Sequence, residues 1–318
     1  MSKIPVFATV SRTYGFLLGD IATVLQIAWL PMAVAAGLNY YYGQSLNPAE
    51  IVKGGPEAAM QASALSFGIG IASMVASLMV TVGLLRVVMY GQRPAAPFYL
   101  WFGMAELRLL LAYTLLGIAF IAAILAFAVV MGILGAVLAS TPAAPLVAVA
   151  GGAFVIAMFW ALIRLTLIPA VIVAENNLGV ERAWALSGGN ALRLLAILIL
   201  TYLPFAVIMV FLTFTVVGLP FPDFAGLAGD GMDAKAVEQA VQAWQKSFMD
   251  TMYGNWLTIS ILNFINSIVS AVLFAGIAGY AYMSVAGYQS NAELGVSFVH
   301  PSIPSWPVAR QCAQASRG

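Results

Sequence analysis

Long runs of apolar residues dominate the chain, and short polar segments separate them. Six of these runs reach the roughly 20 residues that a helix needs to cross the hydrocarbon core of a bilayer. They cover approximately residues 21–41, 62–90, 109–139, 144–174, 192–217 and 256–288. None alternates apolar and polar positions as the strands of a membrane barrel do. The pattern therefore predicts an all-α, polytopic integral membrane protein with six transmembrane helices.

The composition excludes a soluble domain. Of the 318 residues, 62% are hydrophobic and 8% are charged, and the mean hydropathy is +0.97. Soluble domains carry about 25% charged residues, which they need to keep their surface in water. The 13 basic and 12 acidic residues nearly cancel, so the chain lacks the basic footprint of a nucleic-acid-binding protein. We expect one transmembrane domain over residues 1–295 and a polar tail over residues 296–318.

Basic residues fall unevenly on the two sides of the predicted membrane. If the N-terminus is cytoplasmic, all but Lys53, Lys235 and Lys246 lie on the cytoplasmic side, every arginine included. The positive-inside rule then predicts that both termini are cytoplasmic. Residues 33–35 resemble a signal-peptidase site, but the segment that precedes the apolar run, residues 1–20 with Asp20, is longer than a usual signal n-region and favours an uncleaved first helix.

The chain is also similar to itself in three places, which suggests a threefold repeat of a helix pair. Each copy would hold a short amphipathic segment, an outgoing span, an external loop and a returning span. The step Leu30-Pro31 recurs as Leu203-Pro204, and the step Leu84-Leu85-Arg86 of the second span resembles Leu162-Ile163-Arg164 of the fourth. A duplication explains these similarities. Shared constraints on membrane spans explain them equally well, and both interpretations stay open.

The external loop over residues 218–255 is the largest polar segment between spans. Its second half predicts an amphipathic helix with Asp233 as the N-cap. The apolar positions of that helix are Val237, Val241, Trp244, Phe248 and Met252. Such a helix fits a location in the headgroup region, with the tryptophan as an anchor. The alternative is a lid or a docking surface for an external partner.

Residues that carry enzyme chemistry are scarce. The single histidine, His300, and the single cysteine, Cys312, both lie in the tail. The chain shows no phosphate-binding loop, zinc-ligand spacing or nucleophile elbow. Asp223, Asp230 and Asp233 do not have the spacing of a calcium-binding loop. We therefore expect a non-enzymatic protein with no bound metal or cofactor.

Polar residues inside the predicted spans are the better indicators of function, because polar groups in hydrocarbon are usually placed for a reason. The last span carries a polar stripe at helical spacing, made of Ser260, Asn263, Asn266, Ser267 and Ser270. The second span carries a comparable side of small and hydroxylated residues: Ser63, Ser66, Gly70, Ser73, Ser77 and Thr81. These residues either bond neighbouring helices together or line a site for a substrate or lipid headgroup. In the second case Asn263 and Asn266 are the expected contacts.

Four arginines lie near the cytoplasmic ends of the spans: Arg86, Arg108, Arg164 and Arg193. Each could extend into the headgroup region on its own. Each could instead pair with a carboxylate, and Glu175 and Glu181 are the nearest candidates for Arg164. A third hypothesis is that the four converge into a basic pocket for phospholipid headgroups.

Residues 168–190 form the most distinctive segment of the chain. A proline near its start is followed by a Glu-Asn-Asn step, a short helix with a tryptophan, a Gly-Gly-Asn break and then an arginine. These are Pro169, Glu175–Asn177, Trp184, Gly188–Asn190 and Arg193.

This segment resembles a motif in a loose group of bacterial integral membrane proteins. The group includes uncharacterised inner-membrane proteins and the membrane region fused to some glycerophosphodiester phosphodiesterases. The resemblance extends over approximately residues 1–295 and implies a six-span module in the cytoplasmic membrane of a bacterium. It implies no catalytic residue, because this chain has no segment that could hold the phosphodiesterase domain.

Two functions fit these patterns. The first is a non-enzymatic membrane protein that binds lipid and supports or organises partner membrane proteins, or copies of itself. The second is a transporter or channel for a small polar or lipidic solute, lined by the polar stripe. The expected partners are membrane lipids and another membrane protein, and not nucleic acid.

Overall fold

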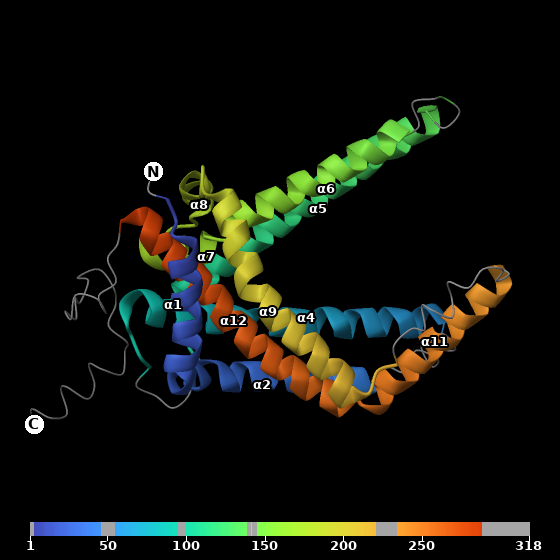
Figure 1. The fold of residues 1–318 in the computed structure, drawn as a ribbon, viewed down its shortest axis with the longest axis horizontal. Helices are drawn as coiled ribbons and strands as arrows, with labels where there is room; N and C mark the ends of the chain where they lie inside the picture. Colours follow the sequence, from blue (N-terminus) through green and yellow to red (C-terminus); the bar gives the residue numbers. More distant parts are fainter. Residues whose placement is uncertain are drawn as a thin grey trace, which may run out of the picture. The chain divides into compact units, whose positions relative to one another are not determined.

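The structure is a computed structural model, and it describes residues 3–45, 55–94, 99–138, 141, 145–220 and 234–287. This part of the chain folds into α-helices and contains no strand (Figure 1). In chain order the helices are α1 (Val6–Gly19), α2 (Ile21–Ser45), α4 (Gly55–Tyr90), α5 (Met104–Leu138), α6 (Pro145–Leu165), α7 (Ile168–Glu175), α8 (Val180–Ser187), α9 (Ala191–Val217), α11 (Ala234–Gly254) and α12 (Trp256–Ala286). The predicted tail lies outside the described residues.

The described residues include six stretches of helix that are long and apolar enough to cross a bilayer. They are Ile21–Gln44, Gly55–Tyr90, Met104–Val137, Pro145–Glu175, Ala191–Val217 and Trp256–Ala286. These stretches match the six runs predicted from the sequence, which confirms the all-α, polytopic membrane fold. The protein is therefore a multi-pass integral membrane protein.

The fourth predicted span differs from the others because its helix breaks into α6 and α7. Proline has no N–H, so Pro169 cannot donate the backbone hydrogen bond that would continue α6. At the break, Thr166 N–H bonds to the Ile163 carbonyl at 3.3 Å, a tighter turn than that of an α-helix. Residues 168–172 of α7 are then buried. The predicted span over residues 144–174 therefore consists of a long helix followed by a short, buried one.

The chain divides into two compact units, and each is described by itself. Unit 1 comprises residues 1–28, 78–201 and 271–318, and unit 2 comprises residues 29–77 and 202–270. Helices α2, α4, α9 and α12 contribute residues to both units.

The core of unit 1 forms where apolar side chains of six helices meet. Its fully buried members include Ile27, Leu84, Leu85, Leu109, Ile168, Ile172, Leu194, Ile197, Leu273 and Ile277. Helix α1 packs on α12 within this unit, since Thr13 lies over Gly276. Close packing of these side chains keeps α7 and the ends of the longer helices together.

Helices α5 and α6 of unit 1 lie side by side as a hairpin (Figure 1). The rings of Phe127 and Phe154 stack between them, with centroids 3.9 Å apart. Much of the surface of the hairpin is exposed and apolar, with Leu125 and Val155 more than 60% exposed. Such a surface is stable in hydrocarbon, which agrees with a membrane-spanning hairpin.

Unit 2 contains the amphipathic helix predicted in the external loop, which is α11. Its five predicted apolar positions are half-buried, while most of the positions between them are exposed. Phe248 and Met252 pack on a small core of Val217, Leu219 and Ile259. The indole N–H of Trp244 donates to the Pro220 carbonyl at 3.0 Å. The helix itself is confirmed, whereas its expected N-cap, Asp233, lies outside the described residues, as do Asp223 and Asp230.

Candidate functional site

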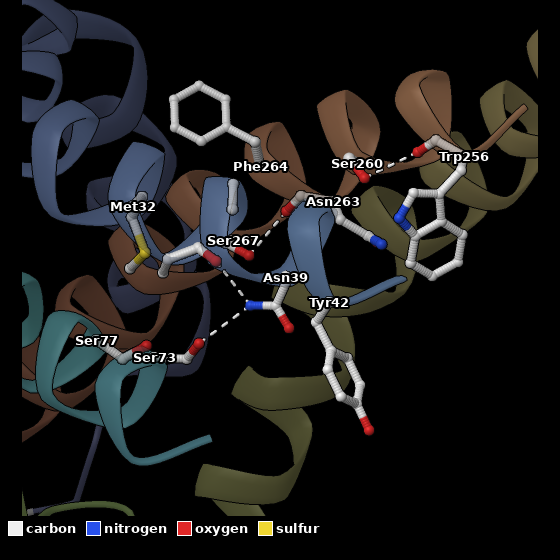
Figure 2. A pocket seen from close by; sticks show the side chains of 12 residues that line it. Met32, Asn39, Tyr42, Ser73, Ser77, Trp256, Ser260, Asn263, Phe264 and Ser267 are labelled. Atoms are coloured by element: carbon white, nitrogen blue, oxygen red, sulfur yellow. Dashed lines mark hydrogen bonds between the residues drawn. The ribbon is translucent and has the colours of Figure 1, made fainter. Parts of the chain in front are cut away.

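Unit 2 holds a pocket of about 440 Å³ within membrane-spanning segments of α2, α4 and α12 (Figure 2). Its lining residues are Met32, Ala35, Ala36, Asn39, Tyr42, Ser73, Ser77, Trp256, Ser260, Asn263, Phe264 and Ser267. The volume falls within the roughly 300–1,000 Å³ of small-molecule sites. Because hydroxyl and amide groups are interspersed with aromatic and aliphatic side chains, the pocket is amphipathic.

The walls of the pocket are joined by hydrogen bonds between helices. The Trp256 indole N–H donates to the Tyr40 carbonyl at 3.2 Å, which ties α12 to α2. Gly43 permits this approach, because a Cβ at that position would overlap the indole ring. The Tyr42 hydroxyl donates to the Ala62 carbonyl at 3.4 Å, which ties α2 to α4. The cavity is therefore a built feature of unit 2.

Asn39 lies on the side of the pocket that faces α4, and its amide is fully used as a donor. Its Nδ2 donates to the Ala35 carbonyl at 2.8 Å and to the Ser73 hydroxyl at 3.0 Å. Figure 2 shows both bonds meeting at the Asn39 nitrogen. The bond to Ser73 supports the interhelical interpretation of the serines in the second span. The Asn39 oxygen stays available as an acceptor.

The serines of α12 use their hydroxyl hydrogens inside their own helix. Ser260 donates to the Trp256 carbonyl at 2.8 Å, and Ser267 donates to the Asn263 carbonyl at 2.7 Å. Such i to i−4 bonds are common for serine and threonine in helices. They leave the serine oxygens as acceptors toward the pocket.

Asn263 differs from the other polar side chains of the pocket because its amide has no hydrogen-bond partner among the described residues, a feature that it shares with Asn266 outside the lining. The residue is exposed and lies within the span Trp256–Ala286. An unpaired amide in hydrocarbon costs several kcal/mol, on the order of 2–7 depending on the reference state. The amide therefore needs water, a ligand or another chain as its partner.

None of the twelve side chains that line the pocket is charged. Without lysine or arginine, the pocket has no positive charge to pair with an anion. Without a carboxylate, it has no negative charge to pair with a cation. The geometry thus favours an uncharged polar group with an apolar extension.

The structure brings together much of the predicted polar stripe. Ser260, Asn263 and Ser267 line the pocket together with Ser73 and Ser77 of the second span. Asn266 and Ser270 do not line it, although their helical spacing places them in the same predicted stripe. At about 100° per residue, Asn266 lies roughly 60° around the helix from Asn263, on the side away from Ser260 and Ser267, which turns it out of the lining.

Sequence reasoning missed Asn39 and Trp256, which complete the site from α2 and from the start of α12. A signal was present, because Asn39 is an amide within the first predicted span. It is flanked by the Tyr40–Tyr42 run, an aromatic composition typical of a membrane interface.

The four arginines proposed to bind headgroups all lie in unit 1, and each contacts the chain itself. Arg86 bonds Tyr99 at 3.3 Å and pairs with Glu106 at 3.7 Å, and Arg193 bonds the Ile4 carbonyl at 2.9 Å. Arg108 bonds the Asn176 side chain. These contacts favour structural roles, and the shared headgroup pocket stays a prediction.

Arg164 holds α8 against α6. It donates to the Trp184 carbonyl at 2.7 Å and to the Ser187 hydroxyl at 3.3 Å, and its guanidinium lies 3.8 Å from the Trp184 ring centroid. Glu175, a carboxylate expected to pair with it, instead accepts from Arg182 and from Tyr282, each at 3.1 Å. The other candidate, Glu181, is exposed.

A second polar cluster lies in unit 1 and was not predicted. The Glu106 side chain is fully buried and accepts from the Tyr99 hydroxyl at 3.1 Å and from the Gly103 N–H at 2.9 Å. Burial raises the pKa of the Tyr99 phenol well above its usual range, while Arg86 opposes this shift. Tyr99 is therefore neutral and can donate to the carboxylate. The bond to Gly103 caps the first turn of α5.

The distinctive segment 168–190 has a local structural explanation. Asn176 ends α7 in the left-handed conformation, at φ 58°. Gly179 is the N-cap of α8, at φ 65°, and its missing Cβ leaves room for Val171. Asn190 accepts from the Ile4 N–H at 3.2 Å, which ties the N-terminal segment to the start of α9. The polar residues of the motif thus hold unit 1 together.

No protein-family model, curated protein or solved structure matches the chain. The resemblance to the membrane region of glycerophosphodiester phosphodiesterases stays a prediction. Within the described residues, no group of three or more histidine, cysteine or acidic side chains could hold a metal ion.

Proposed function

We propose that this integral membrane protein is non-enzymatic and binds a lipid in the pocket of unit 2. The observation that carries the proposal is the Asn263 amide, which is exposed within a membrane span and has no partner among the described residues. The pocket beside it supplies hydroxyl and amide oxygens together with the apolar walls of Met32 and Phe264. An amphipathic lipid satisfies both kinds of surface at once.

Charge supports the predicted orientation in the membrane. The described arginines all belong to unit 1, whereas the described basic residues of unit 2 are Lys235 and Lys246. We therefore place the arginine-bearing helix ends and both termini in the cytoplasm of a bacterium. In this topology Tyr42 and Trp256 of the pocket stand next to the predicted external loops, and aromatic residues concentrate at such membrane interfaces. Partner proteins that the module supports or organises belong to the same proposal.

Filling the pocket tests the lipid site. Ala36 lines the pocket, and Ala36→Phe places a ring in the space that a lipid would occupy. We expect native mass spectrometry of the protein, extracted with its surrounding lipid, to show occupancy by a specific lipid reduced by about tenfold or more. Val34→Phe is the matched control, since Val34 lies on the same helix, is 54% exposed and does not line the pocket. Equal lipid retention by the two variants would contradict the proposal.

The alternative function, transport of a small polar solute, requires a pocket that is persistently filled with water. In a Cys312→Ser background, Asn263→Cys and Asn266→Cys place thiols inside and outside the lining of the same helix. If lipid occupies the pocket, we expect Asn263→Cys to react slowly with a charged thiol reagent in intact membranes. It should react faster once the lipid is stripped with detergent, and Asn266→Cys should change less. Rapid labelling of Asn263→Cys in intact membranes would favour transport.

A further inference from the structure

The hydrogen bonds around the pocket determine which polar group it can accept. Ser260 and Ser267 donate their hydroxyl hydrogens to carbonyl oxygens of their own helix. Asn39 donates its two N–H groups to the Ala35 carbonyl and the Ser73 hydroxyl. Tyr42 likewise donates its hydroxyl hydrogen to Ala62. Each of these groups keeps an oxygen lone pair and has no hydrogen left to offer a ligand.

The lining of the pocket offers a ligand fewer hydrogen-bond donors than acceptors. The Trp256 N–H is already bonded to Tyr40, so it offers the ligand nothing. The Ser73 hydroxyl accepts from Asn39 and keeps its own hydrogen. The Asn263 amide contributes both N–H groups and one oxygen. Ser77 also lines the pocket, and its side chain makes an interaction of its own. Of the other polar groups, Asn263 and Ser73 keep hydrogens to donate, so the pocket presents mainly acceptors, with no cationic side chain among its lining residues.

This arrangement disfavours a phosphate or carboxylate, which is an acceptor and carries charge. It favours an uncharged group that can donate a hydrogen to one of the lining oxygens and accept from the Asn263 amide, and each hydroxyl of an alcohol can do both. We infer that the pocket selects lipids whose uncharged headgroup ends in free hydroxyls, such as a diacylglycerol or a glycosylated lipid. This inference rests on the proposed lipid site and specifies its ligand class.

Three probes with identical acyl chains test the inference. Dioleoylglycerol carries a free hydroxyl, its 3-acetyl ester lacks that hydrogen, and dioleoyl phosphatidic acid replaces the hydroxyl with a phosphate. Each is titrated into the purified full-length protein in detergent micelles, and the bound fraction is measured by native mass spectrometry. We expect the alcohol to bind about tenfold more tightly than the ester, because a site with unpaired acceptors rejects an analogue without the donor. Phosphatidic acid should bind at least as weakly as the ester.

Two leucine variants connect this selectivity to the pocket. Asn263→Leu keeps the size of the side chain and removes the amide, so it should lower the affinity for dioleoylglycerol about tenfold. Asn266→Leu is the same change on the same helix, outside the lining, and should leave both affinity and selectivity unchanged. Equal effects of the two variants would overturn the assignment of Asn263.

The outcomes separate the ligand class from the site itself. If the ester or phosphatidic acid binds as tightly as the alcohol, and Ala36→Phe abolishes that binding, the inference fails while the lipid site stands. If Ala36→Phe leaves the binding of all three probes unchanged, or if none binds, both the inference and the lipid site fail. Tight binding of the alcohol that is sensitive to Ala36→Phe and to Asn263→Leu supports both.

Discussion

Replacing Glu106 with alanine should destabilise the protein by about 3 kcal/mol, the largest effect that we expect from a single substitution. The carboxylate is fully buried and bonds Tyr99, Gly103 and Arg86. Alanine would remove the ion pair of Arg86, whose side chain is only 19% exposed, along with the acceptor of Tyr99 and the cap of α5. Breaking a buried pair by removing one partner is costly because the other charge stays buried.

Reversible unfolding of the detergent-solubilised protein, followed by titration with sodium dodecyl sulfate, measures this loss. Glu106→Gln keeps the shape of the side chain and its acceptor for Gly103, so it should fall between wild type and Glu106→Ala. Glu181→Ala is the matched control, because Glu181 lies in the first turn of α8 and is exposed. If Glu106→Ala unfolds at the same denaturant concentration as Glu181→Ala, the cluster does not stabilise unit 1.

The polar cluster also shows which features of this protein cannot be predicted from the sequence alone. The six spans were predictable, because each needs a long apolar run and the runs are unmistakable. Glu106 and Tyr99 stand at the edge of a span, where charged and aromatic residues are ordinary. Only the fold brings Arg86, which precedes Tyr99 by thirteen positions, to the same carboxylate. Contacts between residues of different helices follow no regular spacing along the sequence, so the pattern of residues does not indicate them.

The pocket was predictable in part, and for a similar reason. The stripe on the last span follows from helical periodicity, so Ser260, Asn263 and Ser267 share a face in any helix. Periodicity does not say which edge of a broad stripe meets the neighbouring helices. The sequence pattern therefore favours Asn266 as a contact as much as Asn263. Asn39 joins the site through the packing of α2 against α4, which depends on contacts such as Tyr42 with Ala62.

The break between α6 and α7 could not be predicted from the sequence either, because a proline in a membrane span does not always end the helix. Pro31 and Pro204 remain inside continuous helices, whereas Pro169 follows a break. In a membrane span, neighbouring helices and local turns can satisfy the carbonyl that a proline leaves free. Whether the helix continues or ends therefore depends on tertiary packing. Around Pro169 the fully buried residues of α7 favour the separate short helix.

Close packing of α1 on α12 gives the second large prediction, which concerns Gly276. A Cβ at this position would lie 2.7 Å from Cγ2 of Thr13, closer than real Cβ contacts come. Thr13 is fully buried, and its hydroxyl is tied to the Thr9 carbonyl at 2.9 Å, so it cannot move aside easily. We expect Gly276→Ala to lower the free energy of unfolding by about 2 kcal/mol through overpacking.

The same unfolding titration distinguishes overpacking from a general effect of alanine in a helix. Gly152→Ala in α6 is the matched control, because a Cβ there meets open space, and it should leave stability unchanged or raise it slightly. Thr13→Ser removes the methyl group that Gly276→Ala would strike and keeps the hydroxyl bond to Thr9. Combined with Gly276→Ala, it should therefore recover part of the lost stability. If the double variant is as unstable as the two single losses added together, the contact is not the cause, because independent sites add and touching sites do not.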